Sequence, residues 1–106
     1  MVERLGHDRG LVRELLETFL AASPQMLAQV HEALAAGDAM RLERGAHGLR
    51  GALVSVSAGA AAAAAEALEH RARERDLDAC RVAAAVLETE VERLELALGT
   101  YLRGPT

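Results

Sequence analysis

The chain contains no lysine and no tryptophan, and its 106 residues include only one cysteine, one phenylalanine and one tyrosine. A single cysteine, Cys80, excludes an internal disulfide framework and a zinc site built from cysteines. Because aromatic side chains are nearly absent, any hydrophobic core must be aliphatic. The sequence has no run of about 18 apolar residues and no charged-then-apolar leader. We therefore expect a cytoplasmic protein with no membrane segment.

The abundant residues favour helices. Alanine occurs 23 times and arginine 12 times, and hydrophobic residues make up 51% of the chain. Ala, Leu, Glu and Arg are good helix formers and β-branched residues are few, which excludes an ordinary β-sandwich or barrel. The net charge of −4 is too small, and the apolar content too high, for a disordered chain. The mild acidity also argues against a nucleic-acid partner, for which a basic stripe is typical.

Turn-forming residues and a 3.6-residue periodicity predict four helices, at about residues 8–36, 39–54, 58–74 and 76–102. We expect Asp8 and Ser57 to cap the first and third helices. Gly37 should end the first helix, and Asp38 should cap the second. Residues 1–7 are expected to be the end of a linker or a short extra helical segment.

Apolar stripes predict which helix faces pack together. The stripes of the first, second and fourth helices are Val12, Leu15, Leu16, Phe19, Leu20, Ser23, Met26, Leu27, Val30 and Leu34; Leu42, Ala46, Leu49 and Leu53; and Cys80, Ala84, Leu87, Val91, Leu94, Leu98 and Tyr101. Pro24 predicts a kink or a break in the first helix. Since the connections are short, successive helices should be antiparallel. The predicted fold is an all-α, up-and-down four-helix bundle, with residues 1–106 as one domain.

His47 is distinguished from the other three histidines by its neighbours. On a helical wheel it lies about 140° from Leu42 and the apolar face, so its ring should be exposed. Arg50 and Gly51 follow one turn later, and Glu43 and Arg44 precede it by one turn. A glycine within a helix costs about 1 kcal/mol relative to alanine, and Gly51 therefore indicates close approach of another molecule. Glu43 could hydrogen-bond a ring nitrogen, with a plainly solvated carboxylate as the equal alternative.

Other kinds of site find little support. The chain has no glycine-rich phosphate loop, no nucleophile elbow and no His-Glu-x-x-His motif, and Glu-x-x-His does not occur in two helices. Unlike His47, none of His7, His31 and His70 has both a glycine and a basic residue at the positions three and four residues later. We expect neither a bound metal nor a cofactor. An exposed histidine is most often ordinary surface, which would suit a helical protein–protein interaction module.

The stretch Ala46-His47-Gly48-Leu49-Arg50-Gly51-Ala52 resembles the signature of histidine phosphotransfer (HPt) domains, Ala-His-x-Leu-Lys-Gly followed by a small residue. The resemblance covers about residues 5–102. Outside the histidine motif, the positions that match the family pattern are Leu15–Leu20, Pro24, Ala33–Asp38, Val56, Ala58, Ala61, Ala65 and Leu68-Glu69. Four positions depart from the family pattern. Arg50 replaces the usual lysine, Ser57 replaces the usual glycine, and Leu53 and Val54 are bulkier than usual.

The resemblance implies a phosphorelay intermediate in which His47 accepts a phosphoryl group from a receiver-domain aspartyl phosphate and passes it to another response regulator. Neutral imidazole is a nucleophile near pH 7. Arg50 would offset charge on the phosphoryl oxygens. As a surface residue, Arg50 should be replaceable by alanine with a stability change within about 0.5 kcal/mol. We expect the partner to contact Glu43, Arg44, Gly51 and Val54.

The resemblance further implies that any Mg²⁺ belongs to the receiver domain, and that the chain has no kinase or ATPase activity of its own. We expect a monomer. One alternative within the same chemistry is the phosphoacceptor domain of a chemotaxis-type kinase, which would need a separate catalytic domain. The alternative with no phosphotransfer chemistry is a helical protein–protein interaction module.

Overall fold

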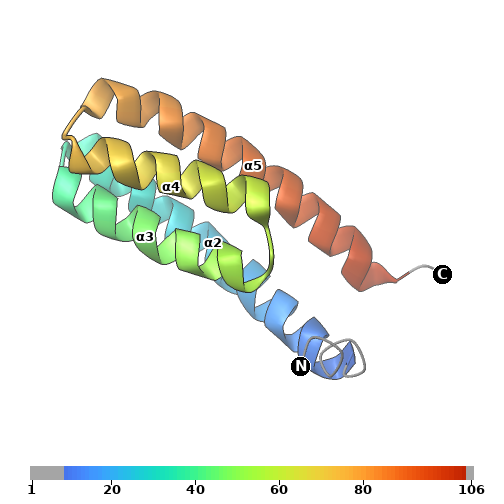
Figure 1. The fold of residues 1–106 in the computed structure, drawn as a ribbon. Helices are drawn as coiled ribbons and strands as arrows, with labels where there is room; N and C mark the ends of the chain where they lie inside the picture. The colour runs from blue at the N-terminus through green and yellow to red at the C-terminus, as the bar shows by residue number, and fades with distance from the viewer. Residues whose placement is uncertain (1–8, 105–106) are drawn as a thin grey trace.

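The computed structural model describes residues 9–104, which form four helices running alternately up and down (Figure 1). The helices are α2 (Arg9–Ala36), α3 (Ala39–Ser55), α4 (Gly59–Arg73) and α5 (Leu77–Arg103). Each helix packs against its neighbours in the chain, and α2 also packs against α5. The predicted all-α four-helix bundle is confirmed, and each helix end lies within one residue of the expected bound. The expected cap at Asp8 and the extra segment over residues 1–7 lie outside the described residues.

A tight turn reverses the chain between α2 and α3. Gly37 has a φ of +67°, a left-handed conformation that glycine adopts without strain. Its N–H donates to the Leu34 carbonyl at 3.1 Å, and the Asp38 N–H donates to the Ala33 carbonyl at 3.0 Å. The Asp38 carboxylate then accepts a hydrogen bond from the Arg41 N–H at 3.1 Å. The predicted glycine end and aspartate cap are both confirmed.

The turn before α4 differs from the prediction. The residue at the N-cap is Ala58, which makes no side-chain cap hydrogen bond, so Ser57 does not cap this helix. Ser57 instead has a φ of +60°, and its N–H donates to the Val54 carbonyl at 2.9 Å. It therefore completes the end of α3, at a position where the left-handed conformation favours glycine.

The core is aliphatic and draws on all four helices. Its buried residues include Leu16, Phe19, Val30 and Ala33 of α2; Leu42, Ala46, Leu49 and Leu53 of α3; Ala61, Ala64, Ala65, Leu68 and Ala72 of α4; and Cys80, Ala84, Leu87 and Val91 of α5. The predicted stripe of α3 is buried in full. Most of the core residues of α4 are alanines, whose short side chains allow a neighbouring helix to approach closely.

The two long helices extend beyond the two short ones (Figure 1). Helices α2 and α5 have 28 and 27 residues, whereas α3 and α4 have 17 and 15. At the extended ends only α2 and α5 meet, and the Arg13 guanidinium donates to the Leu102 carbonyl at 2.5 Å. Leu15 and Tyr101, expected in the core, are therefore 42% and 58% exposed. Of the two outcomes expected from Pro24, a kink at this residue or a break after Ala22, the break is absent, because α2 is one helix from Arg9 to Ala36.

Ser57→Gly should stabilise the domain by about 0.5–1 kcal/mol, because glycine removes the strain of a left-handed serine. Urea unfolding followed by circular dichroism measures the change. Ser55→Gly is the matched control, since Ser55 lies within α3 and the same replacement there should be destabilising. A Ser57→Gly variant that loses stability as the control does would contradict the assigned turn.

Candidate functional site

Helix α3 presents His47 on the side opposite to its buried stripe. Leu42, Ala46, Leu49 and Leu53 all face the core, and the side chain of His47 is 65% exposed. The predicted exposure of this ring is therefore confirmed. A ring in this position is open to groups from outside the chain.

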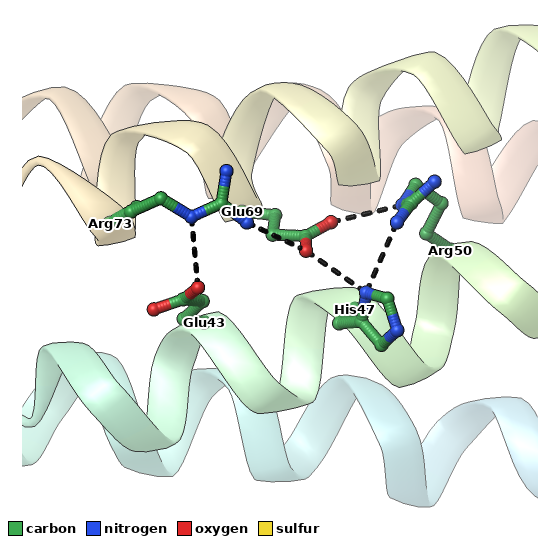
Figure 2. Close-up of polar contacts among 5 residues, drawn as sticks. All are labelled: Glu43, His47, Arg50, Glu69 and Arg73. Carbon is green, nitrogen blue, oxygen red and sulfur yellow. Dashed lines mark hydrogen bonds and ion pairs between the residues drawn. The ribbon is translucent and has the colours of Figure 1, made fainter.

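The ring of His47 is held by a carboxylate from the neighbouring helix. Glu69 of α4 places its Oε2 atom 2.9 Å from Nδ1 of His47 (Figure 2). The side chain of Glu69 is only 8% exposed, so this carboxylate is nearly removed from water. A buried carboxylate requires donors or opposite charges, which the surrounding side chains supply.

Arg50 is the second partner of Glu69. Its Nε–H donates to Oε1 of Glu69 at 2.9 Å, and its Nη2 atom lies 3.1 Å from Nδ1 of His47. Nδ1 cannot both donate to Glu69 and accept from Arg50. The contact with the carboxylate is shorter and pairs a donor with a charged acceptor, so we assign the proton to Nδ1. The other ring nitrogen, Nε2, then carries the lone pair and lies on the side of the ring away from Glu69 (Figure 2).

Two opposing effects act on the ionisation of Glu69. Burial by itself would raise the pKa of the Glu69 carboxyl. The hydrogen bonds from His47 and Arg50, together with the charges of those two groups, outweigh burial and lower that pKa below its ordinary value of 4.5. The carboxylate is therefore ionised at neutral pH and remains an acceptor for the ring.

A further ion pair joins α3 and α4 beside the ring. Arg73 of α4 donates from Nη2 to Oε2 of Glu69 at 3.1 Å and from Nε to Oε2 of Glu43 at 3.0 Å. Glu43 was expected either to hydrogen-bond the imidazole or to be plainly solvated, and the structure shows neither arrangement. The carboxylate of Glu43 binds Arg73, and the carboxylate that binds His47 is that of Glu69 (Figure 2).

The other predicted site residues lie on the exposed side of α3 without contacting the ring. Arg44 is directed to Met40, whose sulfur lies 3.5 Å from Nη2 of the arginine. Val54 is exposed. A Cβ atom built on Gly51 would meet no atom within 4 Å, and the same holds for Gly48. Packing within the described chain therefore does not require glycine at either position.

Arg50 was expected to be an exposed surface residue, but its side chain is partly buried. Its side chain is 34% exposed and ends on the buried carboxylate of Glu69. Removing the guanidinium would leave that carboxylate with fewer donors, which costs about 1–3 kcal/mol for a buried polar group. The sequence predicted almost no change in stability for Arg50→Ala. From the structure we expect this substitution to lower the free energy of unfolding clearly.

The remaining described histidines lie on the surface, each near an exposed glutamate. His31 lies 3.6 Å from Glu88, and His70 lies 3.3 Å from Glu74. His7 lies outside the described residues. Cys80 is fully buried, and burial raises the pKa of its thiol. These residues offer no second site with the arrangement found at His47.

Within residues 9–104, no group of three or more His, Cys, Asp or Glu side chains is arranged to hold a metal ion. In the same part of the chain, no helix combines the length and the hydrophobicity that crossing a membrane requires.

The fold and the site together define a helical bundle that exposes the imidazole of His47, which a buried carboxylate orientates. The family model described as "Hpt domain" matches residues 14–97, which is most of the chain. The chain therefore belongs to the Hpt domain family, whose members carry out histidine phosphotransfer in two-component phosphorelays and interact with receiver domains. Searches of curated proteins and of solved structures find no match.

Sequence reasoning missed two residues of the site. Glu69 entered only as part of the Leu68-Glu69 pair of the resemblance, and Arg73 was not singled out. A signal for Glu69 was present, because it follows Ala61 and Ala65 at intervals of four residues along the buried side of α4. A carboxylate on an apolar stripe requires a partner, but the sequence alone does not show which helix provides it.

Glu69→Gln should make the free energy of unfolding depend less on pH in the acidic range. The folded-state pKa of Glu69 lies below 4.5, so its ionised form contributes stability above that pH, and the contribution is lost as pH falls through the folded-state pKa. The variant should lose about 1–3 kcal/mol of unfolding free energy at pH 7 and should show a shallower decline between about pH 5 and pH 3. Urea unfolding at several pH values measures both quantities.

Glu66→Gln provides the control, since Glu66 is an exposed glutamate on the same helix. This variant should keep the acid dependence of the wild type. An unchanged slope in Glu69→Gln would show that the buried carboxylate is not coupled to folding.

Proposed function

We propose that His47 is the phosphoacceptor of a phosphorelay intermediate, and that Nε2 takes the phosphoryl group from an aspartyl phosphate of a receiver domain and passes it to another response regulator. The observation that carries the proposal is the hydrogen bond between Nδ1 of His47 and Glu69. This bond holds the proton on one ring nitrogen and leaves the lone pair on the exposed one.

The transfer step balances without loss of a proton from the ring. The Nε2 lone pair forms the N–P bond, the P–O bond to the aspartate breaks, and that electron pair leaves with the aspartate carboxylate. The ring keeps its Nδ1 proton and gains positive charge, which Glu69 offsets from 2.9 Å away. Onward transfer is the reverse step with a second aspartate. Because the ring keeps its Nδ1 proton, it leaves as neutral imidazole, so the phosphoimidazolium remains a good phosphoryl donor.

Arg50 supplies the second electrostatic contribution. Its guanidinium lies beside the ring, with Nη2 at 3.1 Å from Nδ1, and it carries a permanent positive charge. We assign it to offset the charge on the phosphoryl oxygens as they approach Nε2. The Mg²⁺ of the reaction would be held by the receiver domain.

The exposed surface of α3 fits the approach of a receiver domain. Gly48 and Gly51 leave open space next to His47, and Arg44, Glu43 and Val54 border that space along the same helix. We propose that these residues contact the partner. We further propose that the domain acts in the cytoplasm, as a monomer, with no kinase or ATPase activity of its own. If a kinase domain with ATP phosphorylates the chain and no receiver does, the chain is instead the phosphoacceptor domain of a chemotaxis-type kinase.

His47→Gln should abolish the uptake of acid-labile phosphate from phosphorylated receiver domains and should leave the helical circular dichroism unchanged. The replacement removes the nucleophile, while the side-chain amide of glutamine can still donate to the buried carboxylate of Glu69, so the bundle should remain folded. Label transfer from a panel of ³²P-labelled receivers measures uptake. His70→Gln is the matched control and should transfer normally, since His70 is an exposed histidine on α4. Labelling of the His47→Gln variant would overturn the assignment.

Gly51→Gln should slow phosphorylation by a receiver far more than phosphorylation by a small donor such as phosphoramidate. The long side chain would occupy the space that is open at Gly51, and only the larger donor needs this space. Gly51→Ala is the control for the change in helix propensity. This variant should stabilise the domain by up to about 1 kcal/mol and should slow transfer only a little. If Gly51→Gln slows phosphorylation by both donors equally, Gly51 serves the fold and not the contact with the receiver.

A further inference from the structure

One oxygen of Glu69 serves two donors. Oε2 lies 2.9 Å from Nδ1 of His47 and 3.1 Å from Nη2 of Arg73, whereas Oε1 is bound by Arg50. Since the carboxylate is almost fully buried, solvent screens these contacts little. An ionised carboxylate oxygen can accept from both donors at once. The positive charge of Arg73 beside Oε2 therefore reduces the negative charge that this oxygen presents to His47.

Arg73 is held in this position from its other side. Its Nε donates to Glu43 at 3.0 Å, so the guanidinium lies between the carboxylates of Glu43 and Glu69 (Figure 2). Glu43 neutralises part of the charge that Arg73 would otherwise direct at Glu69. The pair thus determines how much of the negative charge of Glu69 remains for the ring.

We propose that Arg73, anchored by Glu43, is a positioning residue that limits the hydrogen bond between Glu69 and His47 and thereby sets the equilibrium between phosphorylated His47 and phosphorylated receiver. The proposal rests on the proposed function of His47. Phosphorylation of Nε2 places positive charge on a ring that keeps its Nδ1 proton. A stronger Glu69 acceptor stabilises that ring and favours phosphohistidine, and a weaker acceptor favours the receiver aspartyl phosphate.

The carboxylate does not need Arg73 for its orientation. Arg50 remains on Oε1 at 2.9 Å, so Oε2 should still face Nδ1 when Arg73 is replaced. Removing Arg73 should consequently strengthen the hydrogen bond to the ring. Replacing Glu43 by Gln should have the opposite effect, because the amide oxygen can still accept from Arg73 while the compensating negative charge is lost.

The first test needs no phosphoryl donor. ¹⁵N NMR of the imidazole of the full chain, at about pH 9 where an ordinary histidine is neutral, reports the share of the Nδ1–H tautomer. Arg73→Gln should raise that share or, where it is already complete, move the Nδ1–H proton downfield. Arg71→Gln is the matched control, since it removes the same charge from an exposed arginine of α4 that pairs with Glu74. It should leave the ring signals unchanged.

The second test measures the transfer equilibrium with a receiver domain that phosphorylates the wild type. Arg73→Gln should shift the equilibrium about 3- to 10-fold towards phosphohistidine, the effect of one hydrogen bond. Glu43→Gln should shift it towards the phosphorylated receiver. Arg73→Lys keeps the positive charge but loses the two-pronged contact with Glu43 and Glu69, so its equilibrium should lie between those of the wild type and Arg73→Gln.

An Arg73→Gln variant that matches Arg71→Gln in both measurements, or that loses the Nδ1–H tautomer, would overturn the role of Arg73. If no receiver phosphorylates the wild type, the proposed function of His47 fails, while the NMR comparison still decides whether Arg73 weakens the hydrogen bond between Glu69 and His47.

Discussion

The buried carboxylate of Glu69 is the group on which the geometry of the site depends. An ionised carboxylate with so little contact with water must receive hydrogen bonds from the chain itself, and three side chains provide them: His47 and Arg50 from α3, and Arg73 from α4 itself. Removing any one partner leaves the same charge with fewer donors. The positions of the ring and of both guanidinium groups therefore follow from the need to satisfy one buried charge.

This arrangement makes the two nitrogens of the imidazole unequal. Nδ1 lies against Glu69 and is engaged, whereas Nε2 lies on the exposed side of the ring (Figure 2). A histidine in free solution exchanges its proton between both positions, but a second group that binds one nitrogen selects a tautomer. The bundle contributes rigidity to this selection, because the carboxylate and the ring belong to different helices of one packed core. The alanines of α4 assist, since their small size allows α3 to lie close.

The sequence contained most of the information about the fold. The period of the apolar residues sets the extent of the helices, and the local chemistry of Gly37 and Asp38 sets the bounds between α2 and α3, because capping and turn formation depend on adjacent residues. The errors have physical causes that are not local. Serine is a residue type that favours helix N-caps, but Ser57 has the left-handed conformation that ends α3. Leu15 and Tyr101 continue their stripes correctly, yet the neighbouring short helices end before they can cover them.

For the site, the period of the apolar residues is enough to show which face of α3 is exposed and that His47 lies on it. Helical periodicity places His47 opposite Leu42, Ala46, Leu49 and Leu53 whatever the rest of the chain does. The partner of the ring was decided by the tertiary structure alone. Glu43 is near His47 along the helix and Glu69 is 22 residues away, yet packing of α4 against α3 brings Glu69 to Nδ1 and turns Glu43 to Arg73. Sequence spacing describes neighbours on one helix, whereas a contact between helices depends on how their faces pack.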